Sequence, residues 1–362
     1  MKKRCSIVWF RGDLRLDDNP ALRAAGERGA VLPVFIWAPK EEGAWSPGAA
    51  SRWWLHQSLS ALGADLKKSG LPLILRPGPT LAQLKDLIQE SGADAVFWNR
   101  RYEPAWIERD RRIKEGLQAE GVEVESFNSA LLFEPWELQT KAGGPYRVFT
   151  PFWRACVGRG GPPPPKKAPK RVGAVAGEIS SLKLADLKLE PELDWARGLA
   201  KAWKPGSAGA KSELKRFLEE AVSEYPQARD HPAISGTSRL SPHLHFGEIG
   251  PRQVWHEVKA SLARHHRPGA EHGSEVYLKE LGWREFAHHL LLHFPRTPEE
   301  PLRRDFESFP WRSDARALKA WQRGKTGYPL VDAGMRQLWK TGWMHNRVRM
   351  IVASFLVKDL LL

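Results

Sequence analysis

One stretch of the sequence, residues 280–286, places an acid, a flat aromatic ring and a cation at helical spacing. If this stretch is helical, Glu280, Trp283 and Arg284 share one face, because residues three and four apart are neighbours on a helix. Such a face could line a pocket in which a base stacks on the indole and hydrogen-bonds to the carboxylate. It could equally be a solvated ion pair beside a surface tryptophan, and the stretch alone does not decide between the two.

A second mixed face is expected near the end of the chain, at residues 343–350. At helical spacing Trp343, Asn346, Arg347 and Met350 lie together and combine polar with apolar groups, as the wall of a ligand pocket would. For Met350 the alternative is simple core packing.

A third group combines Tyr225 with residues 236–242, Gly-Thr-Ser-Arg-Leu-Ser-Pro. The glycine permits a tight turn, and hydroxyl and backbone N–H groups gather just before a helix that Pro242 would open. The free N–H donors of a helix start suit an anion such as a pyrophosphate. Without further context, an ordinary helix cap is the favoured interpretation.

Composition narrows the class of protein and of partner. The chain has 362 residues, a net charge of +14, 17 tryptophans and two cysteines. A basic surface favours a polyanion such as nucleic acid over a merely solubilising charge excess. Two cysteines give no disulfide framework, and no apolar run could form a signal peptide core or a membrane span. We therefore expect a cytoplasmic protein without a membrane partner.

The pattern of elements predicts two structural classes in one chain. Strand-like segments at 6–10, 31–37, 71–76, 95–98 and 122–127 alternate with helix-like ones, which favours a Rossmann-like, doubly wound parallel sheet. Residues 158–177 are rich in Pro, Gly and Lys, and the pattern after residue 205 is helical almost throughout. We expect an α/β domain at 1–130, an interdomain linker at 131–205 and an all-helical domain at 206–362.

Taken in order, these motifs and the turn at 325–332 resemble the flavin domain of the DNA photolyase/cryptochrome family. The segments WFRGDLRLDDNPAL at 9–22, RWWLHQSL at 52–59 and NRRYEP at 99–104 are similar to that family as well, so the resemblance covers the whole chain. The segments ELGWREF and WMHNRVRM look most like class I cyclobutane pyrimidine dimer photolyases. Relatives that repair the (6-4) photoproduct carry a histidine in the region of Asn346.

The resemblance implies light-driven repair of UV-damaged DNA, in which excited reduced FAD passes an electron to a flipped-out dimer. It also implies site residues. Those expected to contact FAD are Tyr225, Thr237, Ser238, Arg239, Leu240, Ser241, Tyr277, Arg284, Asn346 and Arg349. Those expected to contact DNA are Arg229, Glu280, Trp283, Arg284, Arg347 and Met350, with Glu280, Trp283 and Asn346 also taking part in catalysis.

Trp311 matches one member of the tryptophan chain that reduces the flavin in this family. The other two members, and further flavin contacts, would lie beyond Leu362, so we expect a C-terminally truncated helical domain. A second, antenna chromophore is possible but of unknown identity, because Trp106 stands where folate-binding members carry an acid. The histidine pairs lack the spacing of a metal site, and no metal is expected. The protein is expected to be a monomer that needs no protein partner.

Two other functions remain open at this point. One is a cryptochrome-type blue-light photoreceptor, against which Glu280, Trp283 and Met350 argue because a sensor needs no lesion-binding wall. The other is a non-catalytic nucleic-acid-binding fragment, which flavin content would distinguish from the enzyme.

Overall fold

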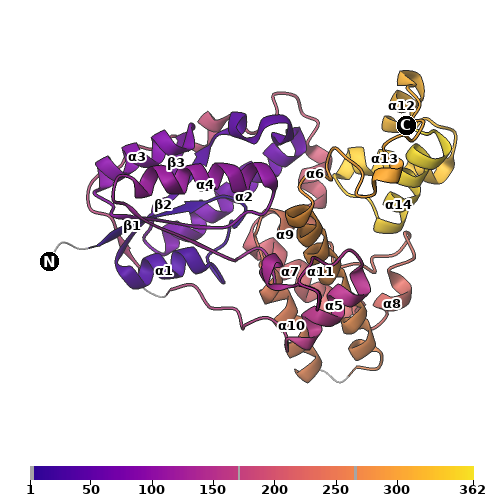
Figure 1. Cartoon of the computed structure of the whole chain (residues 1–362), viewed down its shortest axis with the longest axis horizontal. Helices are drawn as coiled ribbons and strands as arrows, with labels where there is room; N and C mark the ends of the chain where they lie inside the picture. Colours follow the sequence, from indigo (N-terminus) through magenta and orange to yellow (C-terminus); the bar gives the residue numbers. More distant parts are fainter. Residues whose placement is uncertain (1–3, 170–171, 265–266) are drawn as a thin grey trace.

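A parallel β-sheet forms the centre of the N-terminal part of the molecule (Figure 1). The computed structural model describes residues 4–169, 172–264 and 267–362. The sheet has the order β3-β2-β1-β4-β5, and every neighbouring pair is parallel. The strands are β1 (Cys5–Phe10), β2 (Ala30–Trp37), β3 (Ile74–Pro77), β4 (Ala95–Asn99) and β5 (Glu123–Phe127), and a short β6 (Gly173–Ala174) also pairs with β2.

Four helices cover the two faces of this sheet. They are α1 (Pro20–Arg28), α2 (Ala49–Lys68), α3 (Thr80–Ser91) and α4 (Pro104–Gln118). Val8 and Phe10 of β1 pack with α1 and α2, whereas Ile7 and Trp9 pack with α3 and α4. Successive side chains of a strand point to opposite faces, so this division confirms the predicted doubly wound, Rossmann-like sheet. The third strand begins at Ile74, three residues later than predicted.

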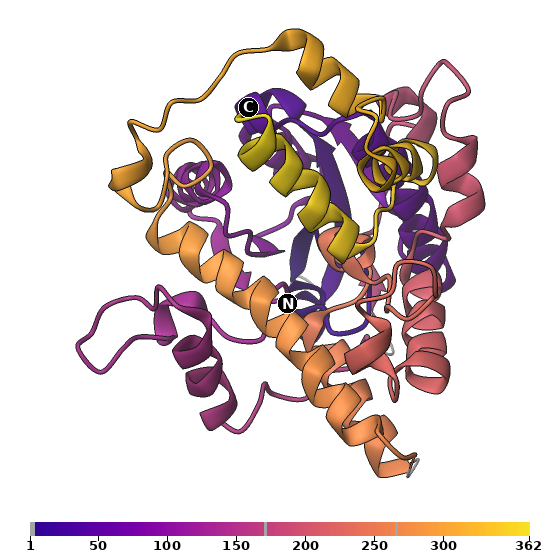
Figure 2. The same ribbon diagram turned by 90° about the vertical axis from the view of Figure 1, so that its right-hand side faces the viewer.

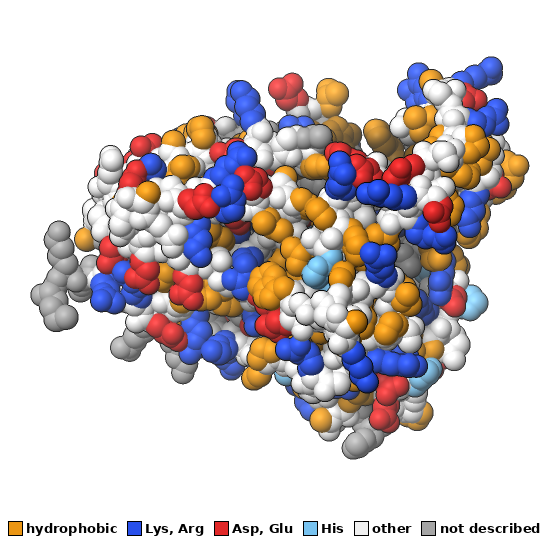
Figure 3. Space-filling view, viewed as in Figure 1, with side chains coloured by type: hydrophobic (Ala, Val, Ile, Leu, Met, Phe, Trp, Pro, Cys, Tyr) orange, Lys and Arg blue, Asp and Glu red, His pale blue; other side chains and the backbone are white. Residues whose placement is uncertain are grey.

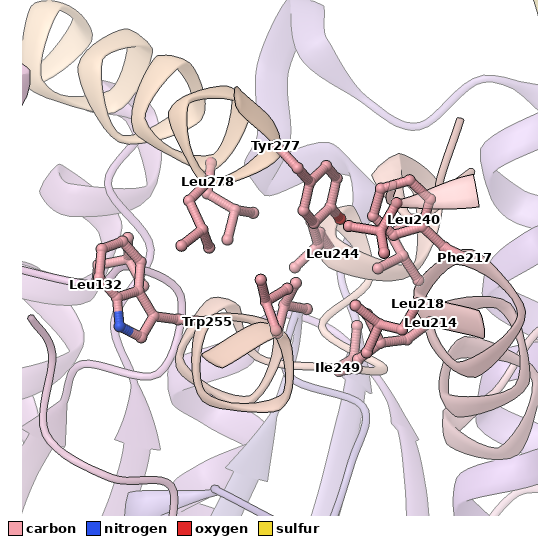
Figure 4. Packing of buried hydrophobic residues seen from close by; sticks show 14 of the residues in the cluster. Leu132, Leu214, Phe217, Leu218, Leu240, Leu244, Ile249, Trp255, Tyr277 and Leu278 are labelled. Atoms are coloured by element: carbon pink, nitrogen blue, oxygen red, sulfur yellow. The ribbon is translucent and has the colours of Figure 1, made fainter. Parts of the chain in front are cut away.

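The second part of the molecule is helical, as predicted, and has its own core (Figure 4). It contains α7 (Ser207–Arg216), a π-type turn η4 (Phe217–Ala221), α8 (Tyr225–Ala228), α9 (Ser241–His245), α10 (Pro251–Arg264) and the long α11 (Ala270–His293). Phe217 of η4, Leu240 just before α9, and Tyr277 and Leu278 of α11 meet in that core. Burial of such side chains is the main stabilising contribution to the helical unit.

The segment 131–205, predicted as a linker, is structured over much of its length. Helix α5 (Phe149–Gly158) contributes Phe152 and Cys156 to the helical core, whereas Leu187 and Leu189 pack in the core of the sheet. Residues 162–169 have no regular structure but are held in place, since the Asp18 N–H donates to the Lys166 carbonyl at 2.6 Å. The remaining short turns are η1 (Pro39–Trp45), η2 (Pro135–Glu137), η3 (Leu184–Leu187) and η5 (Arg304–Phe306).

Buried polar contacts join the sheet to the helical part. The Arg15 guanidinium donates to the carbonyls of Gly247 and Ser129, at 3.0 and 2.9 Å. Glu248 accepts from Trp54 Nε1 of α2 at 3.0 Å and from the Gly206 N–H at 2.7 Å. A buried charge is costly unless its hydrogen bonds are satisfied, so these pairings fix how the two parts meet.

The C-terminal helices form a smaller lobe. They are α12 (Ala315–Gln322), α13 (Pro329–Thr341), α14 (Asn346–Ser354) and a π-type turn η6 (Phe355–Asp359), and α6 (Arg197–Ala202) packs beside α13. Asp332 accepts the backbone N–H groups of Thr326 and Gly327, which fixes the turn that opens α13. Hydrophobic side chains gather on the visible surface of this lobe (Figure 3). Within the described ranges, no helix is long and apolar enough to cross a bilayer.

Candidate functional site: an interdomain cavity and the surface beside it

A cavity of about 400 Å³ lies between the carboxyl edge of the sheet and the helical part. From the sheet side come residues that follow β1 and β4, which are neighbouring strands whose connections leave on opposite faces. Doubly wound sheets bind ligands at this switch point, since the strand ends leave a crevice there. The sheet-side lining residues are Gly12, Asp13, Asn99, Arg100, Arg101, Tyr102 and Glu103, with Ser129 and Ala130 after β5.

A buried hydrogen-bond network holds the sheet side of the cavity in place. The Asn99 side chain donates to Asp13 Oδ2 at 2.5 Å and to Asn19 Oδ1 at 2.8 Å. Asp13 in turn accepts the Arg11 backbone N–H at 2.6 Å. Because each partner is buried and satisfied, the loops after β1 and β4 have a fixed geometry.

One face of α11 forms the opposite wall. Tyr277, Glu280, Leu281, Arg284 and His288 recur at helical spacing and all line the cavity, which confirms that the stretch 280–286 is helical. Burial raises the pKa of Tyr277 to about 12 and lowers that of His288 to about 4. Both side chains are therefore uncharged at neutral pH.

Arg284 is a cation whose charge is poorly compensated. Its Nη1 donates to the Ala130 carbonyl at 2.6 Å, and its nearest carboxylate, Glu285, is 3.7 Å away. Burial lowers the pKa of Arg284, and burial also raises the pKa of Glu285 to about 7. A buried guanidinium beside a partly protonated carboxyl favours an anionic group in the cavity.

The predicted cofactor residues divide into two sets. Ser238, Leu240, Ser241, Tyr277 and Arg284 line the cavity. Those that do not line it are Tyr225, Thr237, Arg239, Asn346 and Arg349.

Each of the second set has other contacts. Tyr225 is buried with its ring edge against Tyr277, and the Thr237 carbonyl accepts from Arg216 at 2.8 Å. The Arg239 guanidinium lies 4.3 Å from the Trp203 ring centroid. Asn346 and Arg349 are exposed on α14. Their predicted contacts with FAD stay predictions.

Five of the six residues predicted to contact DNA lie at the surface beside the cavity, whereas the sixth, Arg284, lies in the cavity wall, and their contacts with DNA stay predictions. Arg229, which follows α8, donates to Glu280 Oε1 at 2.7 Å, and Arg347 of α14 donates to Asp230 at 2.5 Å. Glu280 therefore belongs both to the cavity lining and to this surface. Met350 is exposed, and the Arg347 Nη1 approaches its sulfur at 3.6 Å.

Trp283 also belongs to this surface, one turn along α11 from Glu280, and 49% of it is exposed. The ring of Phe149 lies parallel to it, with ring centroids 3.8 Å apart. Trp311, by contrast, lies in the segment between η5 and α12, is 55% exposed and lines neither this cavity nor the second one described next. Its predicted role in electron transfer stays a prediction.

A second cavity of about 680 Å³ lies on the other side of the residues that follow β1 and β4. Two guanidinium groups lie against the Trp106 ring, with Arg101 at 4.2 Å and Arg109 at 3.9 Å from its centroid. Burial raises the pKa of Glu42, another lining residue, to about 7. A cavity lined by an aromatic ring and two guanidinium groups is suited to a flat, electron-rich or anionic ligand.

The two cavities share four lining residues: Gly12, Arg101, Glu103 and His245. Burial alone would raise the pKa of Glu103, but the paired Arg101 outweighs it and lowers that pKa to about 2. The shared wall thus contains a charged pair.

Sequence reasoning from spacing missed the sheet side of the first cavity. The motif at 99–104 was noted, but nothing in its periodicity assigned Asn99, Arg101 or Tyr102 to a site. His288 belongs to one of the histidine pairs in which the sequence predicts no metal site, and the structure places it in the cavity lining. Within the part of the chain that the structure describes, no cluster of three His, Cys, Asp or Glu side chains could hold a metal ion.

Comparison with known proteins identifies the family. A model described as DNA photolyase matches residues 6–170, and one described as the FAD binding domain of DNA photolyase matches residues 277–362. The chain is 51% identical to the deoxyribodipyrimidine photo-lyase of Agrobacterium fabrum. The aligned region covers 98% of this chain and 73% of that protein. The chain belongs to the DNA photolyase/cryptochrome family. These matches confirm the expected family, and the match to an FAD binding domain supports FAD as the cofactor.

The chain is also similar to a plant cryptochrome and to a photolyase of known structure. Cryptochrome-1 of Arabidopsis thaliana is 42% identical over 98% of the chain, which spans 53% of that protein. The crystal structure of a class III photolyase from Agrobacterium tumefaciens superimposes with a TM-score of 0.95 at 49% identity, covering 100% of this chain and 74% of that one. The fold is thus that of photolyases and cryptochromes.

Proposed function

We propose that this chain repairs cyclobutane pyrimidine dimers in UV-damaged DNA, driven by light and using reduced FAD. The observation that carries the proposal is the position of Glu280. Its carboxylate lines the cavity between the domains and is also paired with Arg229 at the surface that presents Trp283. A lesion held at that surface would therefore be next to a cofactor held in the cavity.

The lining of the cavity fits a cofactor with a pyrophosphate and polar rings. Arg284 has little compensating charge, and the hydroxyls of Ser238, Ser241 and Tyr277 supply hydrogen bonds. These residues would hold FAD, with the buried Asp13–Asn99 network fixing the opposite wall. When bound and excited by light, reduced FAD supplies the electron that splits the dimer.

At the surface, each residue has a distinct proposed role. Trp283 would stack on the flipped dimer, and Glu280 would hydrogen-bond to it once Arg229 moves toward the DNA backbone. Arg347 is paired with Asp230 in the protein alone, so phosphate would replace that carboxylate on binding. A dimer stacks and pairs poorly, which lowers the cost of flipping it out of the duplex.

The sequence motifs resemble those of class I photolyases, whereas one similar solved structure is described as a class III photolyase. The proposed substrate and the residues that would contact it are the same whether the chain is a class I or a class III photolyase. We also assign the second cavity to an antenna chromophore, because Trp106 together with the guanidinium groups of Arg101 and Arg109 would bind a flat anionic ring.

A photoreceptor without repair is the second candidate function, favoured by the 42% identity to a cryptochrome. Preference for dimer-containing over undamaged DNA distinguishes the two, because a sensor has no need of it.

Flavin binding is the first requirement of the proposal and can be tested alone. We expect the purified chain, after incubation with FAD and removal of free ligand, to keep the visible absorption of a bound flavin. Arg284→Ala should reduce the bound fraction, whereas Arg303→Ala, which removes an exposed cation that lines neither cavity, should not. A protein that stays colourless would show that this chain does not hold FAD.

Glu280→Ala is expected to lower the repair yield per absorbed photon by a larger factor than it lowers binding. The Arg229–Glu280 pair is only partly buried, so its loss should change DNA affinity by less than about tenfold. Repair should fall more, because the hydrogen bond to the dimer is lost. The check is the yield at saturating DNA for Glu280→Ala and Glu280→Gln, and an unchanged yield in both would remove Glu280 from the mechanism.

A further inference from the structure

Phe149 stands at the start of α5, within the segment that the sequence pattern assigned to a linker. Its ring and that of Trp283 are nearly parallel, with centroids 3.8 Å apart and an angle of 9° between the planes. Aromatic pairs by themselves favour offset or edge-to-face arrangements at larger separations. The surrounding packing, rather than the pair alone, must therefore hold the two rings face to face.

That packing begins at Gly282, the residue before Trp283. A Cβ at Gly282 would lie 2.3 Å from Cε3 of Trp153, so only glycine lets the Trp153 ring lie this close to α11. Trp153 is one helical turn after Phe149 in α5, and their rings are stacked at 11°. The close approach of α5 to α11 thus brings Phe149 to Trp283. Figure 2 shows α5 beside the long α11.

One more ring contacts Phe149 directly, and another supports Trp153. Phe286, on the next turn of α11, meets Phe149 edge-on at 5.9 Å and Trp283 edge-on at 6.1 Å. Trp153 in turn meets the ring of Trp255 of α10 edge-on, with centroids 6.0 Å apart. Phe149 is therefore in contact with rings of α5 and α11, and α10 supports it only through Trp153, although Phe149 itself is only half-buried.

The consequence concerns the faces of the Trp283 ring. Phe149 covers one face, yet 49% of Trp283 is still exposed, so a planar ligand can stack only on what Phe149 leaves open. A fixed side chain loses less conformational entropy on binding than a mobile one does. Held in this way, Trp283 is preorganised to receive a base from one direction.

We propose that Phe149 is a positioning residue of the lesion-binding surface. It fixes the plane of the Trp283 ring and leaves one face for a flipped pyrimidine dimer. The inference rests on the proposed function and deepens it, because it assigns part of lesion recognition to α5, outside the helices that line the cavity.

The test compares Phe149→Leu, which keeps an apolar side chain but removes the flat ring, with Phe149→Tyr, which keeps the ring. Affinity is measured for one duplex with a cyclobutane dimer and for the same duplex without it. We expect Phe149→Leu to lower the ratio of the two affinities on the order of tenfold, within the range that aromatic stacking on a base contributes. Phe149→Tyr should retain the ratio. Val148→Ala, an exposed neighbour at 60%, is the matched control and should change neither affinity.

Each outcome decides the inference. A purely structural role would lower the melting temperature of Phe149→Leu and affect both duplexes equally, which would overturn the inference, as would an unchanged ratio. Phe149→Met gives the same comparison if the leucine variant does not fold. Wild-type protein that binds both duplexes equally would instead overturn the proposed function itself, and with it this inference.

Discussion

Trp283→Ala is expected to weaken binding to dimer-containing DNA by about tenfold to a hundredfold and to leave binding to undamaged DNA nearly unchanged. The ring is half-exposed beside the cavity, and stacking of a base on an aromatic side chain contributes about 1–3 kcal/mol. Undamaged DNA keeps its bases stacked and is held mainly through its phosphates, so it does not use this ring. The measurement is the affinity for matched duplexes with and without a dimer, at one salt concentration.

Trp339 offers a matched control for this experiment. It is also a tryptophan on a helix, it is 80% exposed on α13, and it lines neither cavity. Trp339→Ala should leave the affinity for both duplexes unchanged. Equal losses on damaged and undamaged DNA in Trp283→Ala would rule out a stacking role and would indicate a general contribution to DNA contact or to folding.

Gly282→Val is expected to destabilise the protein by about 2–3 kcal/mol, because its side chain would have to displace the Trp153 ring. Added volume in a packed interface costs free energy when the neighbour is a rigid ring that cannot turn aside. The shift of Trp153 should also move Phe149 and lower the preference for damaged DNA. The check is the urea midpoint of unfolding, followed by the two-duplex binding comparison on the folded variant.

Gly158→Val is the control for that substitution. Gly158 also lies in a helix, at the end of α5, but a Cβ there would have open space around it. Its free energy of unfolding should therefore stay within about 0.5 kcal/mol of the wild-type value. A Gly282→Val variant as stable as Gly158→Val would contradict the close approach of α5 to α11.

The sheet could be predicted because its signals are local. The apolar strands are short, and the helix after β1 has a recognisable start, because Asn19 caps α1 and Pro20 is its first residue. The stretch 280–286 was predicted as a helical face for the same reason, since one element positions Glu280, Trp283 and Arg284. The partner of Trp283 was not predictable in this way, because Phe149 is far away in the sequence and lies in a segment that shows no signal of its own role.

The cavity shows the same limit. Its helical wall follows from the spacing of Tyr277, Glu280 and Arg284, but its other wall depends on how the end of β4 meets α11 across the domain boundary. The periodicity of a sequence carries no information about a contact between two elements that are far apart in the chain. The position of the two walls depends on buried polar contacts such as that of Arg15 with the Gly247 carbonyl. The partners in these contacts are distant in the sequence and belong to common residue types.

Light-dependent repair tests the central claim most directly. The chain, loaded with FAD and reduced without oxygen, is mixed with an oligonucleotide that contains one cyclobutane pyrimidine dimer, and dimer content is followed under blue light and in the dark. We predict loss of the dimer in the light only, with the flavin unchanged at the end. Persistence of the dimer in the light, by a protein shown to hold flavin and to bind the oligonucleotide, would contradict the proposed function.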